Sequence, residues 1–135
     1  MCTQGEIVKM KLLLICATFV ALAGCTSVPL HTVSDANVIT ASGKPVTADQ
    51  VRAAIVKAGS GLGWVMTPND PGLVTGRIAL RGHVAVVNVR YTAKNFSIIY
   101  KDSTNLDYTG TRIHRNYNGW VENLDRDIRA NILSL

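Results

Sequence analysis

The sequence has little of what catalytic and metal sites are most often built from. It contains three cysteines and three histidines in 135 residues. The histidines, His31, His83 and His114, lack the HxxxH or HExxH spacing that places two metal ligands on one helix face. Pro45 follows Lys44 at the position where a phosphate-binding loop needs Ser or Thr. We therefore expect no enzyme activity, no metal site and no bound cofactor.

The chain is also short and has a low content of charged residues. Charged residues make up 17% of the chain and hydrophobic residues 47%, which excludes a disordered polyelectrolyte. A chain of 135 residues has room for one domain, which excludes most multidomain enzymes. The sequence contains no internal repeat, and no apolar run reaches the roughly 20 residues that a membrane-spanning helix needs.

The longest apolar run lies near the N-terminus. Residues 12–22 are apolar except for one threonine, and two lysines precede them. This pattern, followed by small residues, is typical of a secretory signal peptide, which we expect to span residues 1–24. We expect translation to start at Met10, because Glu6 is unusual ahead of such a run.

The segment Leu22-Ala23-Gly24-Cys25 resembles the lipobox of bacterial lipoproteins. The resemblance implies transfer of a diacylglyceryl group to the Cys25 thiol, cleavage before Cys25 and acylation of the new amino terminus. The acyl chains would then hold the protein on the membrane. Because Thr26 rather than Asp follows Cys25, the resemblance also implies the outer membrane, with the domain facing the periplasm. After cleavage Cys25 is the only cysteine, so the mature chain forms no internal disulfide.

The mature chain is expected to consist of a tether and one domain. Residues 25–45 are rich in Ser, Thr, Ala, Val and Pro without a clear period. They predict a lipidated N-terminus and a flexible tether, with one short strand at residues 38–40. Residues 46–135 then form a single periplasmic domain.

Within that domain, two helices are expected to flank a run of strands. Thr47 and Gln50 have the spacing of a capping box, so a helix should begin there and continue to Ala58, before three glycines. Short connections make the following strands antiparallel neighbours; they are expected at residues 64–67, 73–80, 83–91 and 96–101. The sequence therefore predicts an α+β two-layer sandwich, with an antiparallel sheet of three to four strands, one helix before it and one after it (α-β-β-β-β-α).

Residues 113–135 have the strongest helical pattern. Apolar side chains recur on one stripe of that helix, namely Ile113, Tyr117, Val121, Leu124 and Ile128. We expect this stripe to face the sheet, and we expect Tyr117 and Trp64 to be mostly buried.

A set of motifs runs through the same domain, and its most specific part is C-terminal. It comprises Gly63-Trp64, Asp102-Ser103, Asn105-Leu106, residues 113–118, Trp120, Asn123-Leu124 and Asp127-Ile128. Across residues 47–133 this set resembles a family of small proteobacterial outer-membrane lipoproteins of unknown function. Position 119 departs from the family, since it is Gly where bulkier polar residues are usual. The resemblance implies helices flanking an antiparallel sheet, and it implies no reaction.

A second stripe on the C-terminal helix is the candidate interaction site. Asn116, Trp120, Asn123 and Asp127 follow one another at helical spacing, so they share one flank. Two interpretations stay open. Either Trp120 packs under the sheet edge while the amides bond to the loop backbone around Asn105, or the stripe binds a partner.

The sequence as a whole predicts a lipid-anchored interaction module that binds another envelope protein or peptidoglycan. From Cys25 onward the chain has 12 Lys and Arg against 8 Asp and Glu, which suits an anionic membrane surface or an acidic partner. For an exported domain we expect no nucleic acid. One alternative is a domain that binds a small ligand or lipid between sheet and helices, which requires a cavity. A hydrolase would instead require convergent titratable groups in a cleft.

Overall fold

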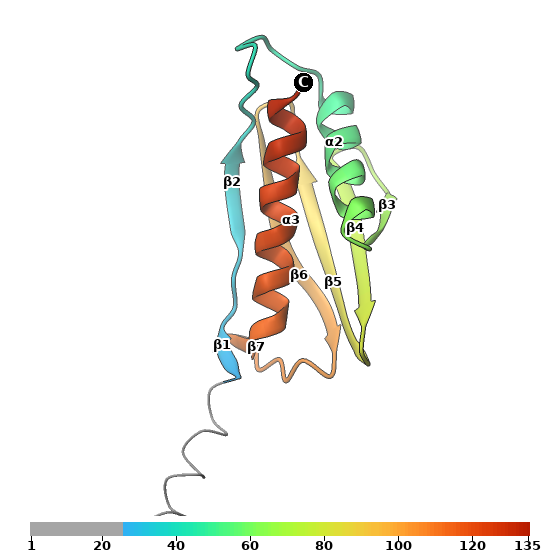
Figure 1. Ribbon diagram of the computed structural model, residues 1–135, viewed down its shortest axis with the longest axis vertical. Coiled ribbons are helices and arrows are strands. Elements are labelled where there is room, and N and C mark those ends of the chain that lie inside the picture. The colour runs from blue at the N-terminus through green and yellow to red at the C-terminus, as the bar shows by residue number, and fades with distance from the viewer. Residues whose placement is uncertain (1–25) are drawn as a thin grey trace, which may run out of the picture.

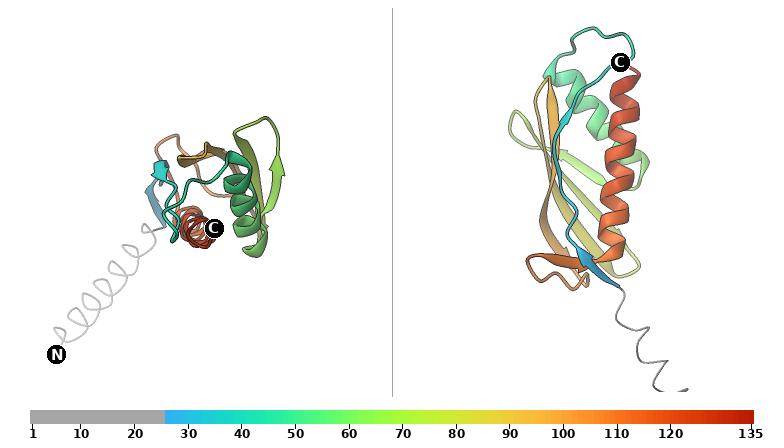
Figure 2. Two further views of the ribbon diagram at one scale, coloured as in Figure 1. Left: turned by 90° about the horizontal axis from the view of Figure 1, so that it is seen from above. Right: turned by 90° about the vertical axis from the view of Figure 1, so that its left-hand side faces the viewer.

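Two helices lie side by side against one face of a curved antiparallel sheet (Figures 1 and 2). They are α2 (Ala48–Gly61) and α3 (Arg115–Leu133). The computed structural model describes residues 26–135, so the predicted signal peptide and Cys25 lie outside the described residues. Seen from above in Figure 2, the sheet curves around the two helices.

The main sheet has five strands in the order β2-β6-β5-β4-β3, and every neighbouring pair is antiparallel. The strands are β2 (Val33–Asn37), β3 (Val65–Pro68), β4 (Leu73–Leu80), β5 (His83–Tyr91) and β6 (Asn95–Thr104). A separate antiparallel pair joins β1 (Ser27–Pro29) to β7 (Arg112–His114). For residues 26–135, an α+β fold with two helices and an antiparallel sheet is thus confirmed.

The capping box predicted for α2 is present. The Gln50 amide donates to the Thr47 hydroxyl over 3.2 Å, and the Thr47 amide donates to the Gln50 side-chain oxygen over 2.9 Å. These two bonds satisfy amides that a helix start otherwise leaves unpaired. The helix ends where Gly63 adopts a φ of +88°, a left-handed conformation that glycine adopts at little cost.

The start of α3 differs from the sequence prediction by two residues. Ile113 belongs to β7, and α3 begins at Arg115. The cap is the His114 side chain, whose Nδ1 accepts from the Asn116 amide over 3.2 Å. A histidine is outside the usual set of capping residues, so the pattern of apolar residues alone placed the helix start too early.

The core fills the layer between the helices and the sheet. The predicted stripe is fully buried, with Ile113 on β7 and its other four residues on α3, and Trp64 and Tyr117 are both buried as expected. Tyr117 meets Tyr100 of β6 edge to face, with ring centroids 5.7 Å apart. The Arg129 guanidinium lies 5.5 Å from the centroid of the Phe96 ring on β6. These contacts fix α3 over the β6 side of the sheet.

The tether predicted for residues 25–45 is wrong for residues 27–37, which belong to the folded domain. Residues 27–29 form β1, and residues 33–37 form β2, which is a fifth strand of the main sheet and precedes α2 in the chain. Val33 and Ala36 of β2 are buried in the core. A bulge lies between them, and Asp35 adopts a positive φ of 47° there, so the two buried residues stand three apart rather than two. The two-residue period that reveals a strand is therefore hidden.

Two further predictions are also wrong: the strand at residues 38–40 and the number of strands in the sheet. Residues 38–40, the one strand expected in the tether, lie outside every strand, although the Val38 amide donates to the Lys94 carbonyl. The sheet has five strands rather than three to four. The folded unit consequently begins before residue 46, close behind Cys25.

Candidate functional site

The first described residues are bound tightly to the rest of the domain. The Thr26 carbonyl accepts from the Arg115 amide over 2.8 Å, and the Leu30 amide donates to the Thr111 carbonyl over 2.9 Å. Between these two bonds, β1 pairs with β7 through main-chain hydrogen bonds. Residues 26–30 are thus held along the end of the domain at the start of α3.

Two side chains complete this arrangement. The Arg112 guanidinium donates to the Ser27 carbonyl over 2.6 Å and to the Ser27 hydroxyl over 3.3 Å. The Asn118 amide donates to the Pro29 carbonyl over 2.8 Å and accepts from the His31 amide over 3.0 Å. We call residues 26–31 with their partners on β7 and α3 the clasp.

The clasp belongs to one end of the molecule, which we call the basal end. It comprises β1, β7, the turn at Arg81-Gly82, the loop at residues 105–111 and the first turn of α3 (Figure 1). Asn105 joins two of these parts, because its side-chain amide donates to the Gly82 carbonyl over 2.8 Å and its carbonyl meets His83 Nδ1 at 2.6 Å. The rings of His83 and His114 stack with centroids 5.6 Å apart.

The structure brings together three of the four residues of the predicted stripe. Asn116, Trp120 and Asn123 line one shallow hollow of about 500 Å³ beside Val28 of β1. Asp127 lies outside that hollow, and its carboxylate accepts from Arg126 Nε over 3.1 Å. The helical period therefore placed the three residues correctly, whereas Asp127 stands one turn too far along α3.

The hydrogen bonds predicted for this stripe differ from those observed. The Asn123 side-chain oxygen accepts from Arg126 rather than from a loop, over 3.0 Å. The Asn105 backbone is bonded to His83 instead. The amide that does hold a neighbouring segment is Asn118, which the stripe did not include. Asn118 does belong to the motif at residues 113–118. However, the sequence of a helix does not show which distant backbone groups a polar side chain on it will bind.

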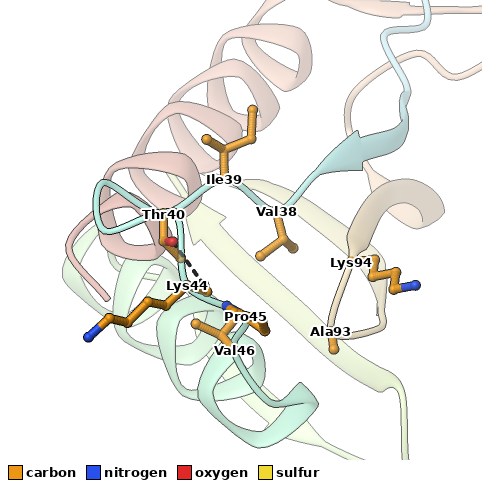
Figure 3. A pocket seen from close by; sticks show the side chains of 9 residues that line it. Val38, Ile39, Thr40, Lys44, Pro45, Val46, Ala93 and Lys94 are labelled. Atoms are coloured by element: carbon orange, nitrogen blue, oxygen red, sulfur yellow. Dashed lines mark hydrogen bonds between the residues drawn. The ribbon is translucent and has the colours of Figure 1, made fainter.

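Two further hollows lie at the opposite end, which we call the distal end. It comprises the β2–α2 connection, the β5–β6 turn and the C-terminal end of α3. One hollow of about 340 Å³ is lined by Val38, Val46 and Ala93 among others, and Figure 3 shows Lys44 and Lys94 pointing away from it. The other, of about 260 Å³, is lined by residues of β2 and the end of α3. Ile39 lines both and is 63% exposed.

An aromatic cluster lies inside the basal end. Tyr108 stacks on Tyr100 with ring centroids 4.0 Å apart, and Tyr100 contacts Tyr117. Burial raises the pKa of Tyr117 well above its ordinary value, and the neighbouring Tyr100 and Tyr108 raise it further. The Tyr117 hydroxyl is buried without a hydrogen-bond partner among the described residues. A phenol in this state holds its proton firmly and has no base beside it, so it is a poor catalyst.

Across residues 26–135, no three His, Cys, Asp or Glu side chains gather closely enough to hold a metal ion. In the same part of the chain, no helix is long and apolar enough to cross a membrane. Comparison of the chain with protein-family models, with curated proteins and with solved structures gave no match.

Proposed function

We propose that this protein is a bacterial outer-membrane lipoprotein, held by acyl chains on Cys25, whose periplasmic domain binds another envelope protein. The observation that carries the proposal is that the folded domain begins directly after the lipobox. The lipobox ends at Cys25, and the next residue, Thr26, already accepts a hydrogen bond from Arg115 of α3. Cleavage before Cys25 would therefore remove none of the strands and helices of the domain, whose first strand, β1, begins at Ser27. The resemblance to small proteobacterial lipoproteins supports the same assignment.

The apolar surface of the distal end suits a protein partner. Ile39, Leu133 and Leu135 expose large apolar side chains there, and Ile39 borders two hollows. Apolar side chains that gather around hollows on a surface are typical of protein interfaces. A polysaccharide such as peptidoglycan presents mostly hydroxyl and amide groups, so this surface suits it less well.

The alternative of a small ligand between sheet and helices finds less support. Side chains fill that layer, and Val87, Ile98 and Tyr117 of the hydrophobic core are fully inaccessible to solvent. The hollows described above lie open at the surface instead, whereas a small-molecule site encloses most of its ligand.

Lipidation is tested on the full chain expressed in a Gram-negative bacterium. Mass spectrometry of the N-terminal peptide should show cleavage before Cys25 and added acyl chains, and the protein should fractionate with the outer membrane. Cys25→Ser should release the folded domain from the membrane. Retention of Cys25→Ser in the membrane fraction after a high-salt wash would refute lipid anchoring.

The partner is tested with a photoreactive amino acid at Ile39 in intact cells. Val65 on the edge strand β3 is the matched control, because it is 65% exposed and lies outside both distal hollows. A protein crosslink at Ile39 but not at Val65, lost on Ile39→Asp at unchanged melting temperature, supports the proposal. Equal crosslinking at both sites, or crosslinks to peptidoglycan alone, would contradict it.

A further inference from the structure

We infer that the basal end docks on anionic phospholipid headgroups of the membrane that holds the acyl chains, so that the domain stands upright on the bilayer. This inference rests on the proposed lipid anchor and adds to it an orientation and a lipid class. Three observations carry it: the absence of slack behind Cys25, the basic side chains of the basal end, and the apolar side chains beside them.

The clasp leaves almost no free chain between the anchor and the domain. Thr26 is hydrogen-bonded to α3, and Cys25 precedes it by one peptide unit, which spans about 3.8 Å between Cα atoms. The glyceryl group on a lipidated cysteine lies at the level of the headgroups. The basal end therefore stays within reach of the headgroup layer, and its charged side chains decide whether it docks there or tilts away; a flexible tether of 20 residues would have let the whole domain move away.

The charge of the basal end matches an anionic surface. Arg81, Arg112 and Arg115 are exposed there, and none of them takes part in a salt bridge within the described part of the chain. Asp107 is the acidic residue of the adjoining loop. Each arginine near an anionic bilayer contributes about a fivefold preference for the bound state.

Two exposed side chains suit the interface between headgroups and acyl chains. Leu80, next to the Arg81-Gly82 turn, is 48% exposed, and Tyr108, in the loop at residues 105–111, is 41% exposed. Tyrosine is enriched at membrane interfaces because its ring is apolar and its hydroxyl is polar. The exposed parts of Leu80 and Tyr108 would thus contact the interface between headgroups and acyl chains, while the Tyr108 ring keeps its stacking on Tyr100.

Charge alone does not distinguish the two ends, because Lys44 and Lys94 lie exposed at the distal end (Figure 3). The position of Cys25 does distinguish them, since it brings only the basal end to the bilayer. The distal lysines therefore supply a matched control. The double substitution Lys44→Glu with Lys94→Glu changes the net charge as much as Arg81→Glu with Arg115→Glu does.

The two arginines are chosen because they can be changed without opening the clasp. The side chains of Arg81 and Arg115 make no hydrogen bond within residues 26–135, whereas Arg112 holds Ser27 and is left intact. Unchanged melting temperatures of both double variants confirm that the fold is kept.

The experiment uses full-length lipidated protein, whose mass is verified first, in vesicles of phosphatidylcholine with or without about 30% phosphatidylglycerol. A fluorophore on Thr111→Cys reports on the basal end, and one on Ala41→Cys reports on the distal end; both positions are exposed. Lipidation of Cys25 leaves the introduced cysteine as the one free thiol of the mature chain. A nitroxide attached to the lipid headgroups quenches any fluorophore that lies near them.

We expect phosphatidylglycerol to increase the quenching at position 111 severalfold, with position 41 unquenched. Arg81→Glu with Arg115→Glu should lower the docked-to-undocked ratio by more than about tenfold, and Lys44→Glu with Lys94→Glu should leave it unchanged. Quenching at position 111 that depends neither on lipid charge nor on the arginine substitutions would overturn this inference, and so would equal quenching at position 41. Either result would leave the proposed lipid anchor intact. A protein mass without acyl chains would overturn the proposed function together with the inference.

Discussion

Asn118→Ala should loosen the clasp while leaving the domain folded. The substitution removes two hydrogen bonds, of 2.8 Å to the Pro29 carbonyl and 3.0 Å to the His31 amide. Each such bond contributes about 0.5 to 1.5 kcal/mol net, and the lower half applies because water can reach the freed groups. Alanine is the better helix former by about 0.5 kcal/mol, which offsets part of the loss. A net loss of about 1 kcal/mol should lower the melting temperature by about 4 °C.

The more specific effect is local, and hydrogen exchange measures it. The backbone amides of Ser27, Val28, Leu30 and His31 should exchange faster in Asn118→Ala, whereas amides of β4 and β5 should keep their protection. Asn123→Ala is the matched control, because it makes the same change on the same helix and its side chain bonds to Arg126 rather than to the clasp. Unchanged exchange at residues 27–31, or an equal increase in Asn123→Ala, would show that Asn118 does not hold this segment.

Three further predictions concern α3 and its surroundings. His114→Ala should cost about 1 kcal/mol of stability through loss of the cap on the Asn116 amide, and His114→Asn should restore most of it in thermal melts. Tyr117→Phe should match or exceed the wild-type stability, because it removes a buried hydroxyl that has no partner, whereas Tyr117→Ala should cost about 3 to 5 kcal/mol. The folded-state pKa of Tyr117 is raised, so unfolding should become easier above pH 10.0, its ordinary value, and the Phe variant should lose less stability there. Asn123→Ala should leave the melting temperature within about 2 °C, and it should leave crosslinking at Ile39 unchanged because Asn123 lines neither distal hollow; a clearly lower melting temperature would make the stripe structural.

The parts of the fold that the sequence predicts well are those with an uninterrupted period. The bounds of β4 and β5 agree with the predicted residues 73–80 and 83–91, because apolar residues alternate and Gly82, with a φ of +80°, supplies the turn between them. The capping box of α2 and the buried stripe of α3 follow from equally local rules. No distant contact is needed to recognise any of these elements.

The parts that escaped prediction depend on long-range partners. The bulge in β2 conceals its alternation, and its strand character follows only from pairing with β6, some sixty residues later. The clasp escaped for a similar reason, since Asn118 and Arg112 bind backbone atoms of residues 27–31, which no side-chain pattern encodes. The three members of the predicted stripe that share a hollow were found because α3 alone positions them.

The clasp determines which surface of a lipid-anchored domain each kind of partner could reach. A helix rises about 1.5 Å per residue, so the 19 residues of α3 place the distal end roughly 28 Å above the basal end. With no slack behind Cys25, Ile39 would stand at that height, facing away from the bilayer. The hollow around Trp120 begins at the first turn of α3 and would lie close to the headgroups. A partner embedded in the same membrane would therefore meet Asn116 and Trp120, whereas a periplasmic partner would meet Ile39, so the crosslinking site itself identifies the compartment of the partner.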